Sequence, residues 1–245
     1  MLKAFRCDLH VHTCLSPCAD LDMYPGALVR RFLEEELDIV AICDHNASEN
    51  VPYVLKVAEG KPLTILPGME ITSVEEVHVL ALFDKLEPLE ALQRVVYDHL
   101  TGLNDEEAFG SQPIVNDLGE VEGFNERLLI GATSLGIQEV IEHIHRLRGL
   151  VVAAHIDRQS FSVIGQLGFI APDMYFDAAE VSLTGGIQEG RRLFPDLDSL
   201  AMVTSSDAHF IADIGRKWTQ IHLAEATIDE LSLAFQRQAG RFIAE

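Results

Sequence analysis

Imidazole and carboxylate side chains recur in this sequence where predicted strands pass into loops. Six of the ten histidines and two acidic residues lie at or near such strand ends: His10, His12, His45, His78, His155 and His209, with Glu70 and Asp207. These are the side chains that divalent transition metals prefer as ligands. If the strands share one sheet edge, the eight side chains meet there and can hold a group of metal ions.

The pattern carries more weight than any one position, because a single histidine at a strand end is more often a structural polar residue than a ligand. His10 and His12 alternate in DLHVH, and alternate residues of a strand point to one face. Asp207 and His209 repeat this spacing in SSDAH. The remaining histidines are interpreted as structural residues outside the site: His99, His143, His145 and His222.

Short apolar runs alternate with helical patterns, which is typical of βα units and a parallel sheet. Seven strands are predicted, at about 3–8, 38–43, 63–67, 77–83, 150–155, 178–183 and 201–206. Helices are predicted over 25–36 and from near Ser48 to Gly60. Thr227 and Glu230 have capping-box spacing ahead of a last helix. Active groups of α/β barrels lie at the carboxyl ends of the strands, which is where the candidate ligands fall.

One segment, 84–130, interrupts the alternation. The run QPIVNDLGEVEGF, within 112–124, predicts two short strands around Asp117 and Gly119 rather than a crossover helix. We therefore expect a β-hairpin insertion in a single α/β barrel domain over 1–245. No internal repeat or low-complexity linker indicates a second domain.

The charge of the chain bears on its partners. Eighteen Lys and Arg residues against thirty-nine Asp and Glu give a formal charge of −21, which disfavours polymeric nucleic acid and anionic membranes and favours a small substrate. Bound divalent ions would offset this charge locally. The apolar runs are too short to span a bilayer, and the four cysteines do not form the pattern of a small secreted domain. A cytoplasmic protein with reduced thiols is expected.

The runs DLHVHTCLSPCAD, ICDHN, PGMEI, HVL, AAHIDR and SSDAH resemble the successive motifs of the PHP family, named for polymerase and histidinol phosphatase. The resemblance extends from about residue 5 to 223. It implies a distorted, TIM-like (β/α)7 barrel with a site for three metal ions. Its implied ligands are His10, His12 and Asp207 for one ion, His78 and His155 for a second, Glu70 as a bridge, and His45 and His209 for a third, with Asp44 as a hydrogen-bond partner behind the ligands.

The third ion needs one more ligand, and here the first motif departs from the family pattern. Ser16 is followed by Pro17 and Cys18, where the family usually has Asp or His. Counting back from Pro25 instead places the family's acidic ligand at Asp20. Asp20 is therefore the prediction, with Cys18 as the alternative.

These expectations define a metal-dependent phosphoesterase that hydrolyses a small phosphate ester or nucleotide. Two to three divalent ions (Zn, Mn or Fe) would supply a bridging hydroxide as nucleophile. Glu70, Asp207 and His209 are the candidate catalytic residues. Arg158 and Arg216 are candidates for phosphate binding, since a guanidinium offers paired donors. Two alternatives remain: a hydrolase of C–N bonds like the amidohydrolases, and a metal-stabilised regulatory module with little turnover.

Overall fold

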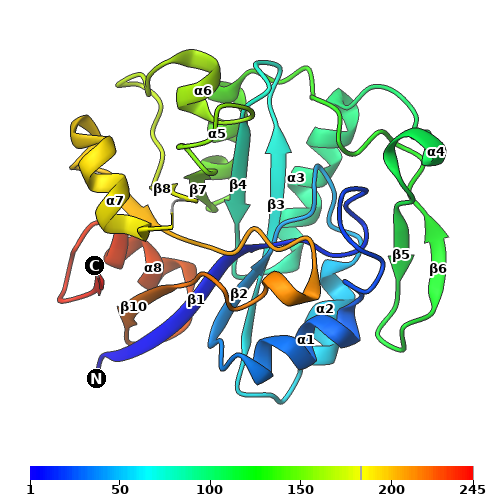
Figure 1. Cartoon of the computed structure of the whole chain (residues 1–245), viewed down its shortest axis with the longest axis horizontal. Coiled ribbons are helices and arrows are strands. Elements are labelled where there is room, and N and C mark those ends of the chain that lie inside the picture. Colours follow the sequence, from blue (N-terminus) through cyan, green and yellow to red (C-terminus); the bar gives the residue numbers. More distant parts are fainter. Residues whose placement is uncertain (183, 245) are drawn as a thin grey trace.

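A computed structural model describes residues 1–182 and 184–244. Within them, one nine-stranded sheet curves into a nearly closed barrel, in the order β11-β10-β1-β2-β3-β4-β7-β8-β9 (Figure 1). The strands are β1 (Lys3–Val11), β2 (Ile39–Ile42), β3 (Thr64–Thr72), β4 (His78–Leu82), β7 (Leu150–Ala153), β8 (Ala178–Glu180), β9 (Ala201–Val203), β10 (Thr219–Leu223) and β11 (Phe242–Ile243). The predicted α/β barrel is confirmed, and its seven predicted strands correspond to β1–β4 and β7–β9.

The barrel closes between its first and last barrel strands, β1 and β9. Val11 forms a parallel bridge with Ala208, and the His12 amide donates to the Ala208 carbonyl at 3.1 Å. Nearer the middle of β1, the buried Asp8 carboxylate accepts from the Ser206 amide at 3.0 Å. These contacts bring the end of β1 and the segment after β9 together, and with them His10 and Asp207.

One strand runs against the expected parallel order. β4 is antiparallel to both β3 and β7, so the prediction of an all-parallel barrel is wrong at this strand. The connection from Thr72 to His78 is a short turn, whereas a parallel crossover needs a dozen residues or more. Because β4 is reversed, its first residue, His78, lies at the rim where the parallel strands end. We call this edge of the barrel the rim.

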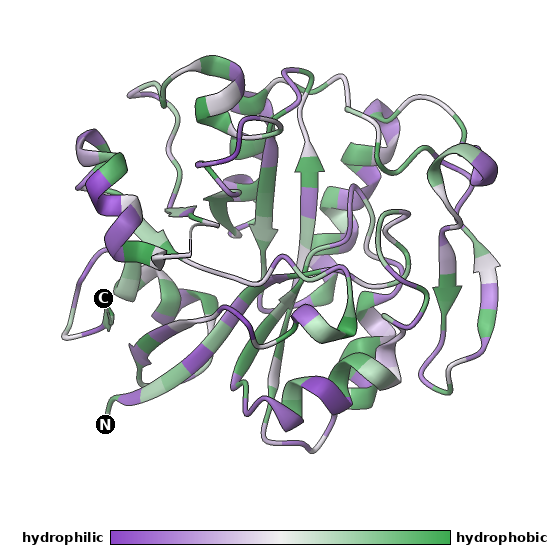
Figure 2. Ribbon diagram, in the orientation of Figure 1, coloured by the Kyte–Doolittle hydropathy of each residue, from purple (hydrophilic) through white to green (hydrophobic). Residues whose placement is uncertain are grey.

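Apolar side chains fill the barrel and cover it outside. Leu66, Leu80 and Val152 belong to an inner cluster that also contains Leu231 and Phe235 of α8 (Ile228–Phe235). The start of α8 is tied to the end of β4 away from the rim, so this helix closes the opposite end. The outer strand faces pack against α1 (Pro25–Glu34), α2 (Val51–Ala58), α3 (Leu86–His99) and α5 (Ile137–Arg146). Figure 2 shows the apolar strands at the centre.

The segment 84–130 is only partly an added hairpin. It begins with α3, whose Leu89, Leu92 and Val96 are buried against the barrel. A short helix, α4 (Glu106–Phe109), then precedes β5 (Pro113–Val115) and β6 (Val121–Phe124), which form the predicted antiparallel hairpin beside the main sheet (Figure 1). The sequence pattern therefore located the hairpin correctly but missed the helix before it.

The remaining elements lie between β7 and β10. They are α6 (Val163–Leu167), α7 (Gly186–Leu193) and the 3-10 turns η1 (Pro195–Leu197) and η2 (Ile211–Asp213). α7 packs on β9, and η2 lies beside α1. None of the helices in the described part of the chain is long and apolar enough to cross a membrane.

Candidate metal centre

The rim brings together the eight side chains that sequence spacing selected. They come from six different strands or the loops that follow them: His10 from β1 and His12 directly after it, His45 after β2, Glu70 from β3, His78 from β4, His155 after β7, and Asp207 and His209 after β9. All are buried except Asp207 and His209, which are partly buried. Residues far apart in the sequence thus converge on one small volume.

Glu70 lies at the centre of this group, and each of its two oxygens faces a different set of imidazoles. Its Oε1 is 2.8 Å from His78 Nδ1 and 3.3 Å from His155 Nε2. Its Oε2 is 3.0 Å from His45 Nδ1, 3.3 Å from His12 Nε2 and 3.4 Å from His10 Nε2. A carboxylate shared in this way could bridge two cations, each held also by the imidazoles on its own side.

The donor atoms fit metal ions better than hydrogen bonds among themselves. His45 Nδ1 and His78 Nδ1 lie 3.0 and 2.8 Å from Glu70 oxygens, yet neither buried nitrogen has a hydrogen-bond partner of acceptable geometry within the described residues. His10 Nε2 and His12 Nε2 face each other at 3.2 Å, where two lone pairs would repel without a proton or cation nearby. The sets that could each hold one ion are His10/His12/Glu70, His45/Glu70/His78 and His12/His45/His209.

Asp207 divides its carboxylate between the centre and an arginine. Its Oδ1 lies 3.2 Å from His12 Nε2 and 3.4 Å from His10 Nε2, while its Oδ2 pairs with the Arg158 guanidinium at 2.7 Å. Its backbone has φ +48°, a conformation that costs energy for a residue other than glycine. The chain therefore stores strain at this residue while placing it between the histidines and Arg158.

A polar chain behind His12 fixes its ring. Asp44 accepts hydrogen bonds from the Thr13 amide and hydroxyl and from the Ser16 hydroxyl, each at 2.7 Å. Ser16 Oγ in turn lies 2.9 Å from His12 Nδ1. Asp44 thus lies one step behind the candidate ligands, and it leaves His12 Nε2 to face the centre.

Glu180 is a functional candidate that sequence reasoning missed. This carboxylate is 1% exposed, and both of its oxygens lie 3.2 Å from His10 Nδ1. It also accepts from the His155 amide at 3.2 Å. The only signal was one acidic residue within the run AAEV of the predicted strand 178–183. Glu180 holds His10 so that Nε2 points to the centre.

The electrostatics of the metal-free rim are set by burial and by the two carboxylates. Burial opposes protonation of His12, but hydrogen bonds from its ring to Asp207 and Glu70 outweigh burial and raise its pKa to about 9. Burial, reinforced by the charge of His12, instead lowers the pKa of His209 to about 3. The His209 ring is therefore neutral at physiological pH, as a metal ligand must be.

The candidates for the third ion's last ligand are placed differently from expectation. Asp20 is exposed, and its carboxylate accepts from the Asp22 amide of its own turn at 2.9 Å, so it does not join the ligand sets. Only its backbone amide reaches the site, donating to the His209 carbonyl at 2.8 Å. Cys18 is also exposed and is likewise absent from these sets, but its side chain interacts with the buried His45 ring and raises the pKa of that ring. Of the two side chains, that of Cys18 is the one that interacts with a candidate ligand.

The two arginines selected for phosphate binding differ in their position relative to the rim. Arg158 lines the rim cavity, whereas Arg216 is 68% exposed, pairs with Asp213 at 2.5 Å and does not line it. The interpretation of Arg216 as a phosphate ligand is therefore not supported by its position. His143 and His145 lie on α5 away from the rim, and His145 pairs with Asp177 at 3.0 Å.

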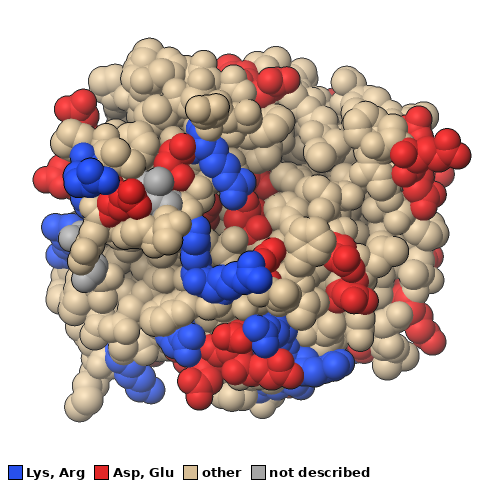
Figure 3. Space-filling view, in the orientation of Figure 1, with Lys and Arg blue, Asp and Glu red and all other residues tan. Residues whose placement is uncertain are grey.

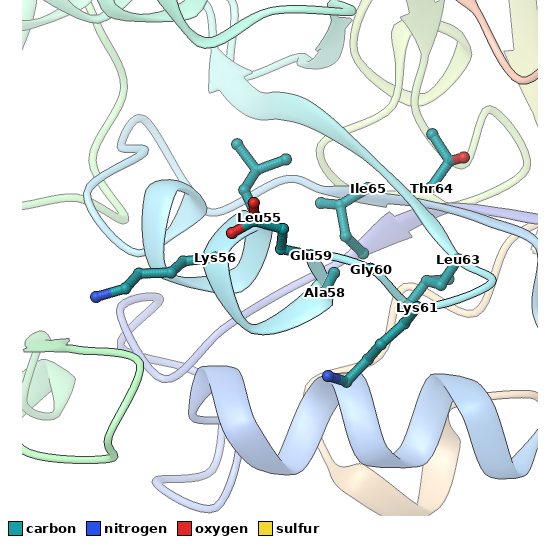
Figure 4. A pocket seen from close by; sticks show the side chains of 9 residues that line it. All are labelled: Leu55, Lys56, Ala58, Glu59, Gly60, Lys61, Leu63, Thr64 and Ile65. Carbon is teal, nitrogen blue, oxygen red and sulfur yellow. The ribbon is translucent and has the colours of Figure 1, made fainter.

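The rim encloses a cavity of about 180 Å³, which opens past Arg158, Ile130 and Phe161. Figure 3 shows basic side chains on two sides of a hollow near the centre of this face, although the chain is acidic overall. A larger hollow, of about 480 Å³, lies between the end of α2 and the start of β3. That hollow is lined by Lys56 and Lys61 together with apolar residues and contains none of the candidate ligands (Figure 4).

Comparisons with known proteins bear on the family and the fold of the chain. Residues 8–182 match the model of the PHP domain, and residues 197–239 match that of a PHP-associated region. No curated protein matches the chain.

Solved structures share the fold at low sequence identity. Endonuclease Q from Pyrococcus furiosus superposes with a TM-score of 0.78 and 17% identity over 98% of this chain and 58% of its own. Endonuclease Q bound to a 27-mer duplex substrate with an abasic lesion gives 0.76 and 18%, with the same coverage. A putative metal-dependent phosphoesterase from Bifidobacterium adolescentis gives 0.57 and 22%, over 83% and 87%. The chain thus spans about 58% of the endonuclease Q length.

Proposed function

The chain belongs to the PHP domain family, and on that basis we propose that it is a phosphoesterase whose rim holds two or three divalent ions. Membership of the family confirms the expectation of a metal-dependent hydrolase. The observation that carries the proposal is Glu70, whose two oxygens face different sets of imidazoles. A regulatory module without turnover would have no need for this arrangement.

When bound, the ions would acidify a water molecule and neutralise charge on a phosphoryl group. The residues of the chain determine where this happens. Glu70, His10 and His12 form one ligand set, and His78 with His155 faces the other Glu70 oxygen. Zn, Mn and Fe all suit imidazole and carboxylate donors of this kind.

Arg158 and Asp207 define the substrate side of the site. Arg158 is 43% exposed, so its guanidinium can exchange the Asp207 oxygen for a phosphoryl oxygen without leaving the cavity edge. Arg158 would then orient the phosphate while Asp207 turns to the ligand set. His209 also lines the cavity, and as a neutral ring in one of the ligand sets it would hold an ion there.

A small phosphate ester is our first choice of substrate. The cavity of about 180 Å³ admits a phosphoryl group and little more, and the charge of −21 opposes close approach of a long polyanion. Nucleic acid is the second candidate, because the chain superposes over 98% of its length on endonuclease Q. That enzyme contains a further part that this chain does not match, so the likeness concerns the barrel.

A turnover screen on metal-reconstituted protein tests both choices. The substrates are small phosphomonoesters, phosphodiesters, nucleotides, amides and a DNA duplex with and without an abasic site, each with Zn, Mn or Fe. We expect hydrolysis of a small phosphate ester with at least two ions per chain. Cleavage of DNA alone would transfer the function to the second candidate, and cleavage of amides alone would refute phosphoester hydrolysis.

A further inference from the structure

An aromatic ring stands at the mouth of the rim cavity in a conformation that its own chain disfavours. Phe161 is 41% exposed and lines the cavity together with Arg158. Its backbone has φ +58°, a left-handed value that side chains with a Cβ rarely adopt. A half-exposed phenyl group in a strained backbone, at the edge of a catalytic cavity, is a candidate for direct contact with substrate.

A backbone hydrogen bond accounts for the conformation of Phe161, but it does not require an aromatic side chain at this position. The Phe161 carbonyl accepts from the His78 amide at 2.9 Å, which ties the loop to the first residue of β4. Glycine or asparagine would make the same hydrogen bond with less strain. The phenyl ring itself stacks on the His78 imidazole, with 4.7 Å between centroids and 22° between planes. The ring thus lies nearly parallel to a candidate metal ligand and is fixed in orientation.

A second apolar side chain lines the same cavity. Ile130 is 36% exposed, and its neighbours are held firmly to the rim. Asn46 Nδ2 donates to the carbonyls of Leu129 and Gly131 at 2.8 and 2.9 Å. The cavity therefore combines a deep polar end, with Glu70 and the imidazoles, and an apolar edge whose two side chains are held in place.

We propose that the substrate is a phosphate ester whose leaving group carries a flat ring, a nucleobase or an aryl group, which stacks at Phe161 beside Ile130. This inference rests on the proposed phosphoesterase function and adds the chemistry of the leaving group. The phosphoryl group fills the cavity beside Arg158, and the ring remains outside because about 180 Å³ does not hold both. Stacking of a base on an aromatic side chain should change kcat/KM by about 10-fold to 100-fold.

The sharpest test compares a nucleoside 5′-monophosphate with ribose 5-phosphate. Both lose phosphate from the same 5′ oxygen, so the ratio of their kcat/KM values reports the base alone. We expect the metal-loaded protein to favour the nucleotide at least tenfold. Phe161→Leu should bring the ratio close to one, whereas Phe161→Tyr should keep it. Phe169→Leu is the matched control, since Phe169 is 61% exposed but does not line the cavity.

Binding gives a readout that does not depend on turnover. The affinity of the metal-loaded protein for the nucleotide, measured by titration, should fall with Phe161→Leu in the same proportion as kcat/KM. The same titration with a single-stranded oligonucleotide that carries a 5′-phosphate shows whether the site binds a free nucleotide or the terminal nucleotide of a strand. Stacking of the base in either form supports the inference. A ratio near one in the unsubstituted protein, or a ratio unchanged by Phe161→Leu, would overturn it.

The stacking site and the phosphoesterase activity can be refuted by different results. If ribose 5-phosphate and the nucleotide are hydrolysed equally well, the stacking site is refuted and the phosphoesterase remains. If neither they nor p-nitrophenyl phosphate are hydrolysed by protein with verified metal content, the phosphoesterase itself is refuted. Folding of each variant is checked by its thermal unfolding midpoint.

Discussion

Replacement of Glu180 by Gln tests whether a residue outside the ligand sets controls metal binding. Glu180 is buried, contacts His10 Nδ1 through both oxygens at 3.2 Å, and accepts from the His155 amide. Glutamine has the same size and can still accept one hydrogen bond. It lacks the negative charge that makes the opposite nitrogen of His10 a stronger donor. The substitution therefore removes charge with little change in packing.

The expected magnitude follows from this geometry. Carboxylates that hold the far nitrogen of a ligating histidine typically contribute 10-fold to 100-fold to metal affinity. Glu180 has one such contact, to His10, and its other hydrogen bond is to the His155 backbone, which Gln can preserve. We therefore expect the metal dissociation constant for the ion at His10 to rise about 10-fold to 30-fold, equivalent to about 1.4–2 kcal/mol.

Competition with a chromophoric chelator, using metal-free protein at fixed pH, measures this dissociation constant for Zn²⁺. Glu189→Gln is the matched control, because Glu189 is on α7 and bonds the Gly185 amide away from the rim. If the role of Glu180 were purely structural, Glu180→Gln would lower the thermal unfolding midpoint without weakening the binding of one particular ion. Zn²⁺ affinity within twofold of the unsubstituted protein, in a folded Glu180→Gln variant, would refute the reasoning.

Three further predictions concern the centre itself. Glu70→Gln should lower phosphoesterase turnover by several orders of magnitude while the barrel stays folded. His143→Ala on α5 is the control and should leave turnover intact. Equal turnover in the two variants, with metal content verified, would contradict the role of Glu70. Elemental analysis should show that Cys18→Ser loses one ion and Asp20→Asn keeps it, and the reverse result would restore the acidic ligand. Metal affinity should rise about tenfold per pH unit for each proton displaced, up to a pH of about 9. The reason is that His12 has a raised pKa of about 9 and must lose its proton to bind a metal ion. A metal affinity that does not depend on pH between 7 and 9 would contradict this.

Sequence patterns predicted which side chains converge at the rim wherever a candidate residue follows a regular strand. His10, His45 and His155 each follow an apolar run that is buried in the barrel, so their convergence follows from the α/β architecture. The direction of β4 could not be read in the same way, because a buried strand shows the same apolar run whether it is parallel or antiparallel. The short connection from Thr72 to His78 was the available signal.

The missed or misplaced residues share a different cause. Glu180 is recognisable only through its contact with His10, 170 positions away in the sequence. Asp20 was selected by counting along a loop, and the loop turns its carboxylate towards Asp22 instead. Arg216 is close in sequence to His209 but pairs with Asp213 outside the cavity. Spacing predicts side-chain position along regular strands and loses that power in loops.

The reversed strand makes the metal centre sensitive to the length of one turn. Glu70 pairs with Leu80 and Thr72 with His78 across the β3–β4 hairpin, so two candidate ligands share a single ladder. Side chains on a strand alternate between faces, and a shift of one residue in pairing would turn one of the ligands from the rim towards the outer helices. In a parallel βαβ unit, a crossover helix would absorb such a change. Homologous chains should therefore tolerate insertions in the 112–124 hairpin far more readily than in residues 73–77.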